Sequence, residues 1–158
     1  MSARATLDTS IGPLTVETDG RQLSRVAWTR LDAPEGMADP LLNEALDQLR
    51  AYFDGRLTDF DLPLAPAASP RGGALRDAIR AIPHGEALSY GALARIAQSG
   101  PRAIGQACAR NPFPVIVPCH RVLAAGGRLG TYTGGDGPAT KRRLLEHEGY
   151  MFDFKEMM

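Results

Sequence analysis

The sequence predicts an α+β protein in which a small N-terminal domain of strands and a helix precedes a mostly helical C-terminal domain. Strand-like alternation of apolar and polar residues is confined to the first 30 residues, and helical spacing dominates from residue 41 onward. A segment with three prolines, 62–70, separates the two patterns. We therefore place one domain at residues 1–69 and the other at residues 70–158.

The N-terminal segment is predicted to form antiparallel strands. Apolar residues alternate with polar ones at 14–16 and again at 26–28, and Asp19-Gly20 between them is a tight-turn dipeptide, so we expect a hairpin. Apolar residues then recur at helical spacing over 41–53, and Gly55 ends the run. This pattern predicts an amphipathic helix packed on the sheet.

The C-terminal domain begins with a helix whose apolar face lies within 75–82. Ser89 is placed to cap a short second helix, and Pro101 suits the first position of a third, which Asn111-Pro112 ends. Two short helices joined by a tight turn predict a helix-turn-helix.

The remaining chain alternates between a buried segment, a loop and a helix. The wholly apolar run 115–117 predicts a short buried strand that leads into Pro118-Cys119-His120-Arg121. Glycines punctuate a loop from Gly126 to Gly135, and a final helix is expected from Pro138 until Gly149 ends it.

Composition indicates a folded intracellular protein. The chain has 158 residues, 44% of them hydrophobic, which is enough for one or two small cores. No apolar run approaches the roughly 20 residues of a membrane span, and the first residues lack the apolar segment of a secretory signal. Two cysteines are too few for a disulfide framework, which fits a reducing compartment. We expect no membrane association.

Basic residues are concentrated in one stretch of the C-terminal half. Residues 95–143 contain eight of them against Asp136 alone: Arg95, Arg102, Arg110, Arg121, Arg128, Lys141, Arg142 and Arg143. Sixteen of the 18 basic residues are arginine, which suits bidentate contact with phosphate. A solvated helix face is the alternative, but the cluster favours a nucleic-acid partner.

Cys119 is the candidate nucleophile, because it follows a buried segment and precedes His120 and Arg121. A thiolate at neutral pH requires a nearby positive charge, helix N-terminus or base, and these neighbours are suitable in type. A buried structural cysteine is the alternative. We interpret Cys108 in that way, because it lies mid-helix between alanines with no acid or base close in sequence.

Glu148 lies at the end of the last predicted helix, where the helix dipole disfavours a carboxylate. This departure from the local rule indicates a tertiary role, although an exposed glutamate is the alternative. No metal site is predicted, because His84, His120 and His147 are scattered and the cysteine spacing matches no ligand set.

The segment 111–122, NPFPVIVPCHRV, resembles the active-site signature of the O6-alkylguanine-DNA alkyltransferases, or methylated-DNA–protein-cysteine methyltransferases. The family's other motifs occur in order around it: IPHG at 82–85, SY at 89–90, RAIG at 102–105, GTYTGG at 130–135 and LLEHEG at 144–149. The resemblance covers nearly all of residues 82–149.

The resemblance implies a ribonuclease-H-like N-terminal domain and an enzyme that acts once. The alkyl group on O6 of guanine in duplex DNA would pass irreversibly to Cys119, with O4-alkylthymine as a further candidate substrate. No cofactor or metal is implied. The expected protein is a cytoplasmic monomer, associated with the nucleoid in a prokaryote.

The resemblance also assigns roles to residues. His120 would activate Cys119 through water, Glu148 would hold the imidazole, and Asn111 would tie the recognition helix to the active-site turn. Tyr90 would help to rotate the phosphate and donate towards the guanine ring.

DNA contacts are implied for residues on the recognition helix and after the cysteine. Arg102 would fill the space left by the flipped nucleotide, with the helix in the minor groove. Tyr90, Arg110 and Arg121 are the other expected DNA contacts. The expected substrate pocket consists of Tyr132, Thr133, Val122 and Pro114.

Two other functions fit parts of the pattern. A non-catalytic protein that binds alkylated bases would share the DNA-binding features, but such relatives carry another residue at the cysteine position, so Cys119 argues against this alternative. A Cys-His hydrolase would require turnover by water. A stable adduct on Cys119, no adduct, or a transient acyl species would separate the three functions.

Overall fold

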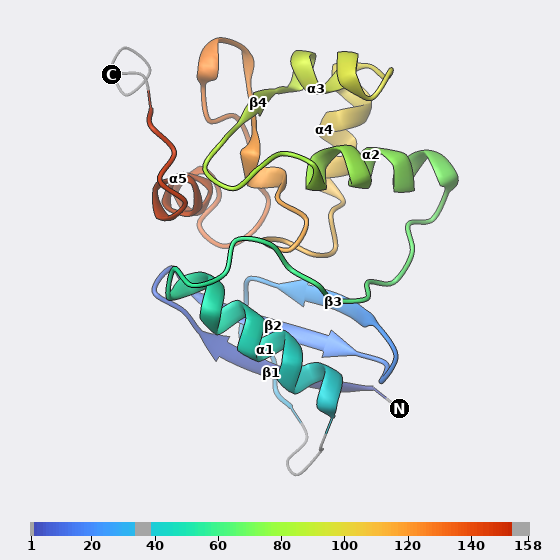
Figure 1. Ribbon diagram of the computed structural model, residues 1–158, viewed down its shortest axis with the longest axis vertical. Helices are drawn as coiled ribbons and strands as arrows, with labels where there is room; N and C mark the ends of the chain where they lie inside the picture. The colour runs from blue at the N-terminus through green and yellow to red at the C-terminus, as the bar shows by residue number, and fades with distance from the viewer. Residues whose placement is uncertain (1, 34–38, 153–158) are drawn as a thin grey trace. The chain divides into compact units, whose positions relative to one another are not determined.

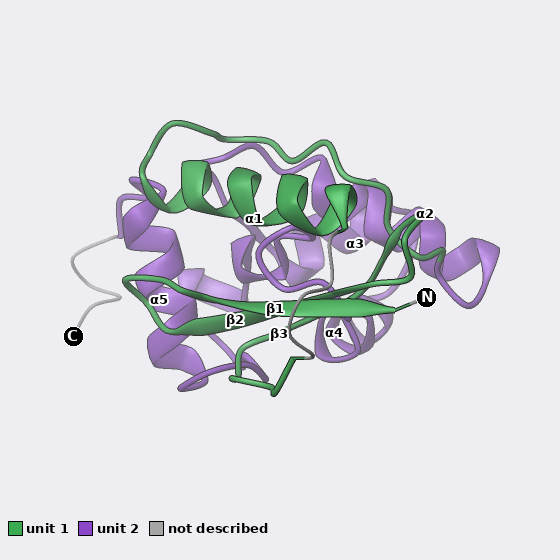
Figure 2. Ribbon diagram, turned by 90° about the horizontal axis from the view of Figure 1, so that it is seen from below, with its two compact units in different colours: residues 1–66 green, residues 67–158 purple. Residues whose placement is uncertain are grey.

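The computed structural model describes residues 2–33 and 39–152. The chain forms two compact units, residues 1–66 and 67–158, shown in different colours in Figure 2. The division falls within the proline-rich segment that the sequence indicated as a linker. The expected α+β class is confirmed, with a sheet in the first unit and a mostly helical second unit.

The first unit is a three-stranded antiparallel sheet covered by one helix. Strands β1 (Ala3–Asp8), β2 (Pro13–Thr18) and β3 (Leu23–Ala27) pair in the order β1-β2-β3. Helix α1 (Pro40–Phe53) lies along one face of this sheet (Figure 1). The predicted hairpin and amphipathic helix are therefore confirmed.

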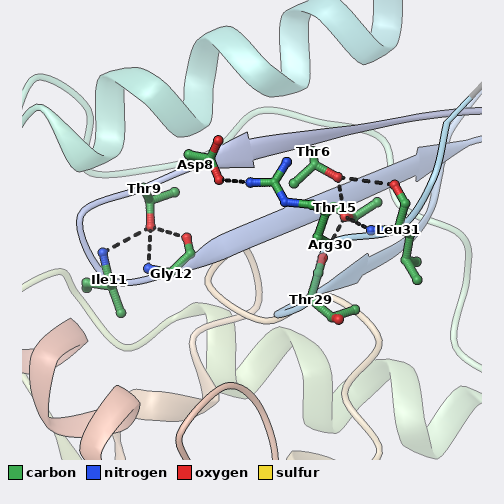
Figure 3. Close-up of polar contacts among 9 residues, drawn as sticks. All are labelled: Thr6, Asp8, Thr9, Ile11, Gly12, Thr15, Thr29, Arg30 and Leu31. Atoms are coloured by element: carbon green, nitrogen blue, oxygen red, sulfur yellow. Dashed lines mark hydrogen bonds and ion pairs between the residues drawn. The ribbon is translucent and has the colours of Figure 1, made fainter. Parts of the chain in front are cut away.

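The turns of the sheet are held by local side-chain hydrogen bonds. The Thr9 hydroxyl accepts from the backbone N–H groups of Ile11 and Gly12 at 3.2 and 3.1 Å (Figure 3). At the predicted tight turn, Asp19 Oδ1 accepts from the N–H groups of Arg21 and Gln22. In each turn, the side chain of a short polar residue accepts from backbone N–H groups that have no partner on a neighbouring strand. The reversal of the chain is therefore specified by residues within the turn itself.

A buried threonine fastens the sheet to the chain that follows it. Thr15 is fully buried on the central strand, and its hydroxyl lies 2.7 Å from that of Thr6. It also donates to the Thr29 carbonyl at 2.6 Å and accepts from the Leu31 N–H at 3.2 Å, as Figure 3 shows. The hydroxyl is therefore paired despite its burial, as a buried polar group must be.

Part of the predicted linker belongs to the first unit. The Leu23 N–H donates to the Pro63 carbonyl at 2.7 Å, and the Ala65 N–H donates to the Leu23 carbonyl at 2.8 Å. Leu64 therefore forms a parallel bridge to the edge strand, and prolines on either side leave no donor for further pairing.

The second unit is a set of short helices with two small strands. Its elements are α2 (Pro70–Arg80), β4 (Leu88–Ser89), α3 (Tyr90–Ile96), α4 (Pro101–Ala109), the 3-10 helix η1 (Cys119–Arg121), β5 (Val122–Leu123), the 3-10 helix η2 (Ala125–Gly127) and α5 (Pro138–His147). The Ser89 hydroxyl accepts from the Ala92 N–H at 3.0 Å, and Pro101 opens α4. The predicted caps and helix-turn-helix, α3 and α4, are confirmed.

The apolar run 115–117 differs from its prediction. All three residues are buried, but they form a turn, and Val115 has a φ of 74°. The predicted strand is therefore wrong, because an apolar run shorter than a strand indicates burial without specifying an extended backbone. The turn carries the chain sharply into η1.

Within the described ranges, no helix is long and apolar enough to cross a membrane.

Candidate active site

Cys119 lies at the first position of η1, and its side chain is buried. Its backbone N–H donates to the Val117 carbonyl at 2.8 Å, while the Arg121 N–H donates to the Pro118 carbonyl at 2.9 Å. A tight turn that follows a buried apolar segment therefore holds the thiol in place. A rigid support of this kind keeps a nucleophile in one orientation.

Asn111 connects the end of α4 to this turn. Its Nδ2 donates to the Val117 carbonyl at 2.9 Å and to Cys119 Sγ at 3.2 Å, and its Oδ1 accepts from the Phe113 N–H at 2.9 Å. All three hydrogen bonds require the same orientation of the amide, with Nδ2 as the donor and Oδ1 as the acceptor. The side chain thus both braces the turn and donates to the sulfur.

Cys108 affects the pKa of Cys119, a coupling that the sequence did not predict. A hydrogen bond from Cys108, with a second from Asn111, outweighs burial and lowers the pKa of Cys119. The same hydrogen bond to Cys119, together with burial, raises the pKa of Cys108. Of the two thiols, Cys119 is therefore the one whose ionised form is favoured, and Cys108 is the one whose protonated form is favoured.

His120, Arg121 and Glu148 form a buried network next to the thiol. His120 Nε2 lies 2.9 Å from Glu148 Oε2. Arg121 donates from Nε to Glu148 Oε1 at 2.8 Å and from Nη2 to Oε2 at 2.9 Å, while its Nη1 donates to the Ile82 carbonyl at 2.6 Å. Glu148 caps α5, so the carboxylate that the dipole disfavours is held by two partners distant in sequence.

The protonation of this network follows from its partners. Burial alone raises the pKa of Glu148, but hydrogen bonds and charge from His120 and Arg121 lower it well below its usual value. Burial lowers the pKa of His120 despite Glu148. An ionised carboxylate can only accept, so a neutral His120 donates from Nε2 and has its lone pair on Nδ1. Nδ1 is buried and has no hydrogen-bond partner among the described residues, which leaves it available as a base.

The prediction of Arg121 as a DNA contact is wrong. Its side chain is 5% exposed and its guanidinium is occupied by Glu148 and Ile82. Sequence reasoning counted it with the exposed basic cluster, because a charge next to a catalytic cysteine looks the same whether it faces out or in. Arg102 and Arg110, at the start and the C-cap of α4, are exposed, so both can reach a partner.

Lys141 is a site residue that sequence reasoning missed. It is fully buried on α5, its Nζ donates to the Thr131 carbonyl at 3.2 Å, and it lies 5.8 Å from the centre of the Tyr90 ring. Its charge favours the thiolate of Cys119. A signal was present, because residues 141, 144, 145 and 148 share one helical face, which buries Lys141 with the two leucines.

Tyr90 is brought to the site by pairing of the two short strands. Leu88 pairs with Val122 and Ser89 with Leu123, so the start of α3 lies beside the chain that leaves η1. The Tyr90 side chain hydrogen-bonds to that of Thr131, and burial raises its pKa. A Cβ on Gly130, which has a φ of 72°, would lie 3.2 Å from the Ala124 Cβ and 3.7 Å from the Tyr90 ring.

The expected pocket residues occupy different environments. Val122 is fully buried, whereas Pro114 and Tyr132 are partly exposed and Thr133 is exposed.

Within residues 2–33 and 39–152, no group of three or more His, Cys, Asp or Glu side chains could hold a metal ion.

Comparison with known proteins extends this description. The model of the 6-O-methylguanine DNA methyltransferase DNA-binding domain matches residues 73–150, and that of the ribonuclease-like domain of the same family matches residues 3–66. A methylated-DNA–protein-cysteine methyltransferase of Mycobacterium tuberculosis is 40% identical over an alignment 158 residues long, gaps included, and this alignment covers 90% of each chain. A DNA base-flipping protein of Thermus thermophilus is also 40% identical, over 90% of this chain and 97% of its own.

Solved structures give the same result. The O6-methylguanine methyltransferase of M. tuberculosis has a TM-score of 0.79 and 35% identity over the whole of both chains. The M. tuberculosis OGT in complex with DNA has a TM-score of 0.80 and 39% identity over 92% of each chain. Because both domain models and these relatives span nearly the whole sequence, the chain belongs to the 6-O-methylguanine DNA methyltransferase family.

Proposed function

We propose that this protein repairs DNA by transferring the alkyl group of O6-alkylguanine to Cys119. The observation that carries the proposal is the thiol itself, which receives a hydrogen bond from Asn111 and lies beside a buried imidazole whose Nδ1 is free to accept a proton. A lowered pKa and a neighbouring base are what an attacking thiol requires. Relatives named as methylated-DNA–protein-cysteine methyltransferases support the same reaction.

The proton of the thiol passes to His120. Nδ1 takes it through a water molecule, and Glu148 stabilises the imidazolium that forms through the 2.9 Å hydrogen bond to Nε2. Arg121 keeps the carboxylate ionised and in place. In this arrangement His120 is the base, Glu148 orients the imidazole, and Arg121 orients the carboxylate.

The sulfur attacks the alkyl carbon in the same step in which its bond to guanine O6 breaks. Negative charge on the leaving base is neutralised by a proton that Tyr90, half-buried beside Thr131, donates. The product is a thioether on Cys119. Because water does not displace the thiolate from the alkyl carbon of an unactivated thioether, each chain accepts one alkyl group and is then spent.

DNA is engaged by the helix-turn-helix in the minor groove. The target oxygen is inaccessible in the stacked duplex, so the nucleotide is flipped out, and Arg102 at the exposed start of α4 occupies the space it leaves. Arg110 and Tyr90 contact the backbone. Tyr132, Thr133, Val122 and Pro114 enclose the flipped base, and the same pocket takes O4-alkylthymine.

The second candidate function is binding of alkylated DNA without transfer. The relative from T. thermophilus, named a DNA base-flipping protein, favours it, because that name specifies no transfer. The thiol and its hydrogen-bonded neighbours favour repair for this chain. We further propose that the protein acts as a cytoplasmic monomer on double-stranded DNA.

Cys119→Ser tests the proposal directly. A hydroxyl is nearly the same size as a thiol but a far poorer nucleophile at neutral pH, so the variant binds DNA containing O6-methylguanine and transfers nothing. Intact-mass measurement after one exposure shows one methyl group per wild-type chain and none on the variant. Unmodified Cys119 in the wild type supports the binding-only function, and several transfers per chain would overturn the single-turnover mechanism.

A further inference from the structure

One side-chain contact joins helix α2 to the active-site turn, and no step of the proposed reaction uses it. The Arg76 guanidinium, on α2, lies over the Phe113 ring, with its Cζ 5.3 Å from the ring centroid. Phe113 follows Asn111 by two positions and is fully buried, whereas Arg76 is partly exposed. A cation in this position is attracted by the electron-rich face of the ring and helps to shield it from water.

Phe113 is hydrogen-bonded to both ends of the turn that precedes Cys119. Its backbone N–H donates to Asn111 Oδ1 at 2.9 Å, and its carbonyl accepts from the Val117 N–H at 2.8 Å. The Val117 carbonyl in turn accepts from Asn111 Nδ2 at 2.9 Å. These hydrogen bonds close residues 111–117 into one unit, so a displacement of Phe113 also displaces the Asn111 amide.

The turn contains a conformation that its own residues disfavour. Val115 has a φ of 74°, in the left-handed region, which a β-branched residue rarely adopts. Such a conformation persists only where the surrounding packing imposes it. The buried Phe113 ring, with the guanidinium over it, is part of that packing. Contacts made by the ring therefore help to keep the turn in shape.

The same unit reaches the acceptor sulfur. Asn111 Nδ2 donates to Cys119 Sγ at 3.2 Å, and the Cys119 N–H donates to the Val117 carbonyl at 2.8 Å. A hydrogen bond to the charged form of a group favours that form, and it weakens steeply when donor and acceptor lose their alignment. The path from Arg76 to the sulfur therefore consists of a ring contact, a hydrogen bond from the backbone and a hydrogen bond from the amide.

We propose that Arg76 is a positioning residue for the acceptor thiol, because it fixes Phe113 and thereby keeps the Asn111 amide on the sulfur. The inference rests on the proposed function in taking Cys119 as the acceptor. It adds a determinant of thiol reactivity that lies on α2, away from the residues that carry the chemistry.

The rate of Cys119 alkylation by iodoacetamide, measured as a function of pH, tests the proposal without DNA. The thiolate is the form that reacts, so the midpoint of the profile reports the ionisation of the thiol. The tryptic peptides 103–110 and 111–121 contain one cysteine each, so mass spectrometry follows Cys119 separately. Every variant is measured at a temperature at which it is folded, so that a loss of stability alone does not move the profile.

Three substitutions on α2 give the first comparison. In Arg76→Ala the midpoint moves to higher pH, and the rate below the midpoint falls about three- to tenfold, because the turn loses its cover. Arg76→Lys keeps a cation that can reach the ring and loses less. Arg80→Ala removes an arginine one turn further along the same helix and leaves the profile unchanged. An unchanged profile in Arg76→Ala overturns the proposal.

A double variant asks whether the effect passes through the ring. Phe113→Leu keeps an apolar side chain but removes the ring under the guanidinium, so adding Arg76→Ala to it causes little further change. A full additional shift in the double variant overturns the route through Phe113. Because iodoacetamide replaces DNA in this assay, these shifts are measurable even in a protein that accepts no methyl group from O6-methylguanine, so the two proposals fail separately.

Discussion

At the residue scale, the function of each charged group depends on what it faces. Arg121 and Glu148 are both buried and form a bidentate pair that also holds His120. A charge removed from water is stabilised only if it is paired and hydrogen-bonded, and the partners here satisfy that condition. His120, the proposed base, is therefore held in place by this ion pair.

Glu148→Gln tests this double role. The buried Arg121 guanidinium loses its counter-charge, so the free energy of unfolding falls by about 3–5 kcal/mol. Transfer also slows, because Glu148 raises the pKa of His120 and its loss makes the imidazole less basic. The acidic limb of the pH profile of the transfer rate therefore moves to lower pH.

Arg121→Gln is the matched control for that substitution. It breaks the same ion pair, but Arg121 lowers the pKa of His120, so its removal moves the acidic limb to higher pH. Rates measured by single-turnover quench at a temperature where both variants are folded decide the matter. Shifts in the same direction for both variants would mean that only stability, and not the relay, is affected.

At the element scale, α4 connects the arginine proposed to contact DNA with the turn that carries Cys119. Its start carries exposed Arg102, and Asn111, just beyond its end, hydrogen-bonds to the acceptor thiol. One helix of nine residues therefore connects the two tasks. The loop before α5 makes a second connection, because the Thr131 carbonyl accepts from Lys141 while its side chain hydrogen-bonds to Tyr90.

Arg102→Ala separates DNA handling from chemistry. The variant loses the side chain proposed to replace the flipped base, a step that would offset a few kcal/mol of unstacking and unpairing. Single-turnover repair of duplex DNA therefore falls steeply, while reaction with free O6-benzylguanine barely changes. Arg143→Ala, at an exposed position on α5, is the control and causes only a small loss. An equal loss on duplex and free base would show that Arg102 supports the fold instead.

Gly135→Ala tests the close packing of the loop on α5. Gly135 has a φ of 53°, and an added Cβ would lie 2.6 Å from Thr140 Oγ1, the atom that accepts from the Asp136 N–H. We expect a loss of about 1–3 kcal/mol in the free energy of unfolding, measured in urea. Gly73→Ala on α2, where a Cβ meets nothing within 4 Å, should instead stabilise by roughly 0.5–1 kcal/mol. Similar effects of the two substitutions would contradict the steric argument.

At the scale of the whole molecule, charge is distributed unevenly along a chain with no net charge. The formal charge at neutral pH is zero, yet residues 95–143 contain eight basic residues against one acidic residue. Burial reduces the number that can meet phosphate, because Arg121 and Lys141 are enclosed in the second unit. Five arginines of this stretch are exposed: Arg95, Arg102, Arg110, Arg128 and Arg143.

The salt dependence of DNA binding measures how many of these charges are used. Each neutralised phosphate contributes about −0.9 to the slope of log K against log salt concentration, so five exposed arginines give at most about −4.5. Fluorescence anisotropy with duplex DNA between low and moderate salt provides the slope. A value much steeper than this would show that basic residues other than these five also contact DNA.

Local features of the fold were predictable from the sequence. Asp19 and Ser89 hold a turn and a cap through hydrogen bonds to residues two or three positions away, and Pro101 opens α4. Such features depend on a few consecutive residues, so their sequence signals are sufficient. The turn at 115–117 was not predictable in this way, because a short apolar run reports burial and not backbone direction.

By itself the sequence determined the α+β class, the helix-turn-helix and, through the segment around Cys119, the family. Only the tertiary structure decided that Arg121 and Lys141 face inward, that Glu148 receives two partners and that Cys108 lowers the pKa of Cys119. Burial and pairing are set by residues far along the chain: Arg121 bonds to groups 27 and 39 positions away. No local pattern specifies such contacts, because the free energy that orients a charged side chain comes from the packed surroundings that only the fold assembles.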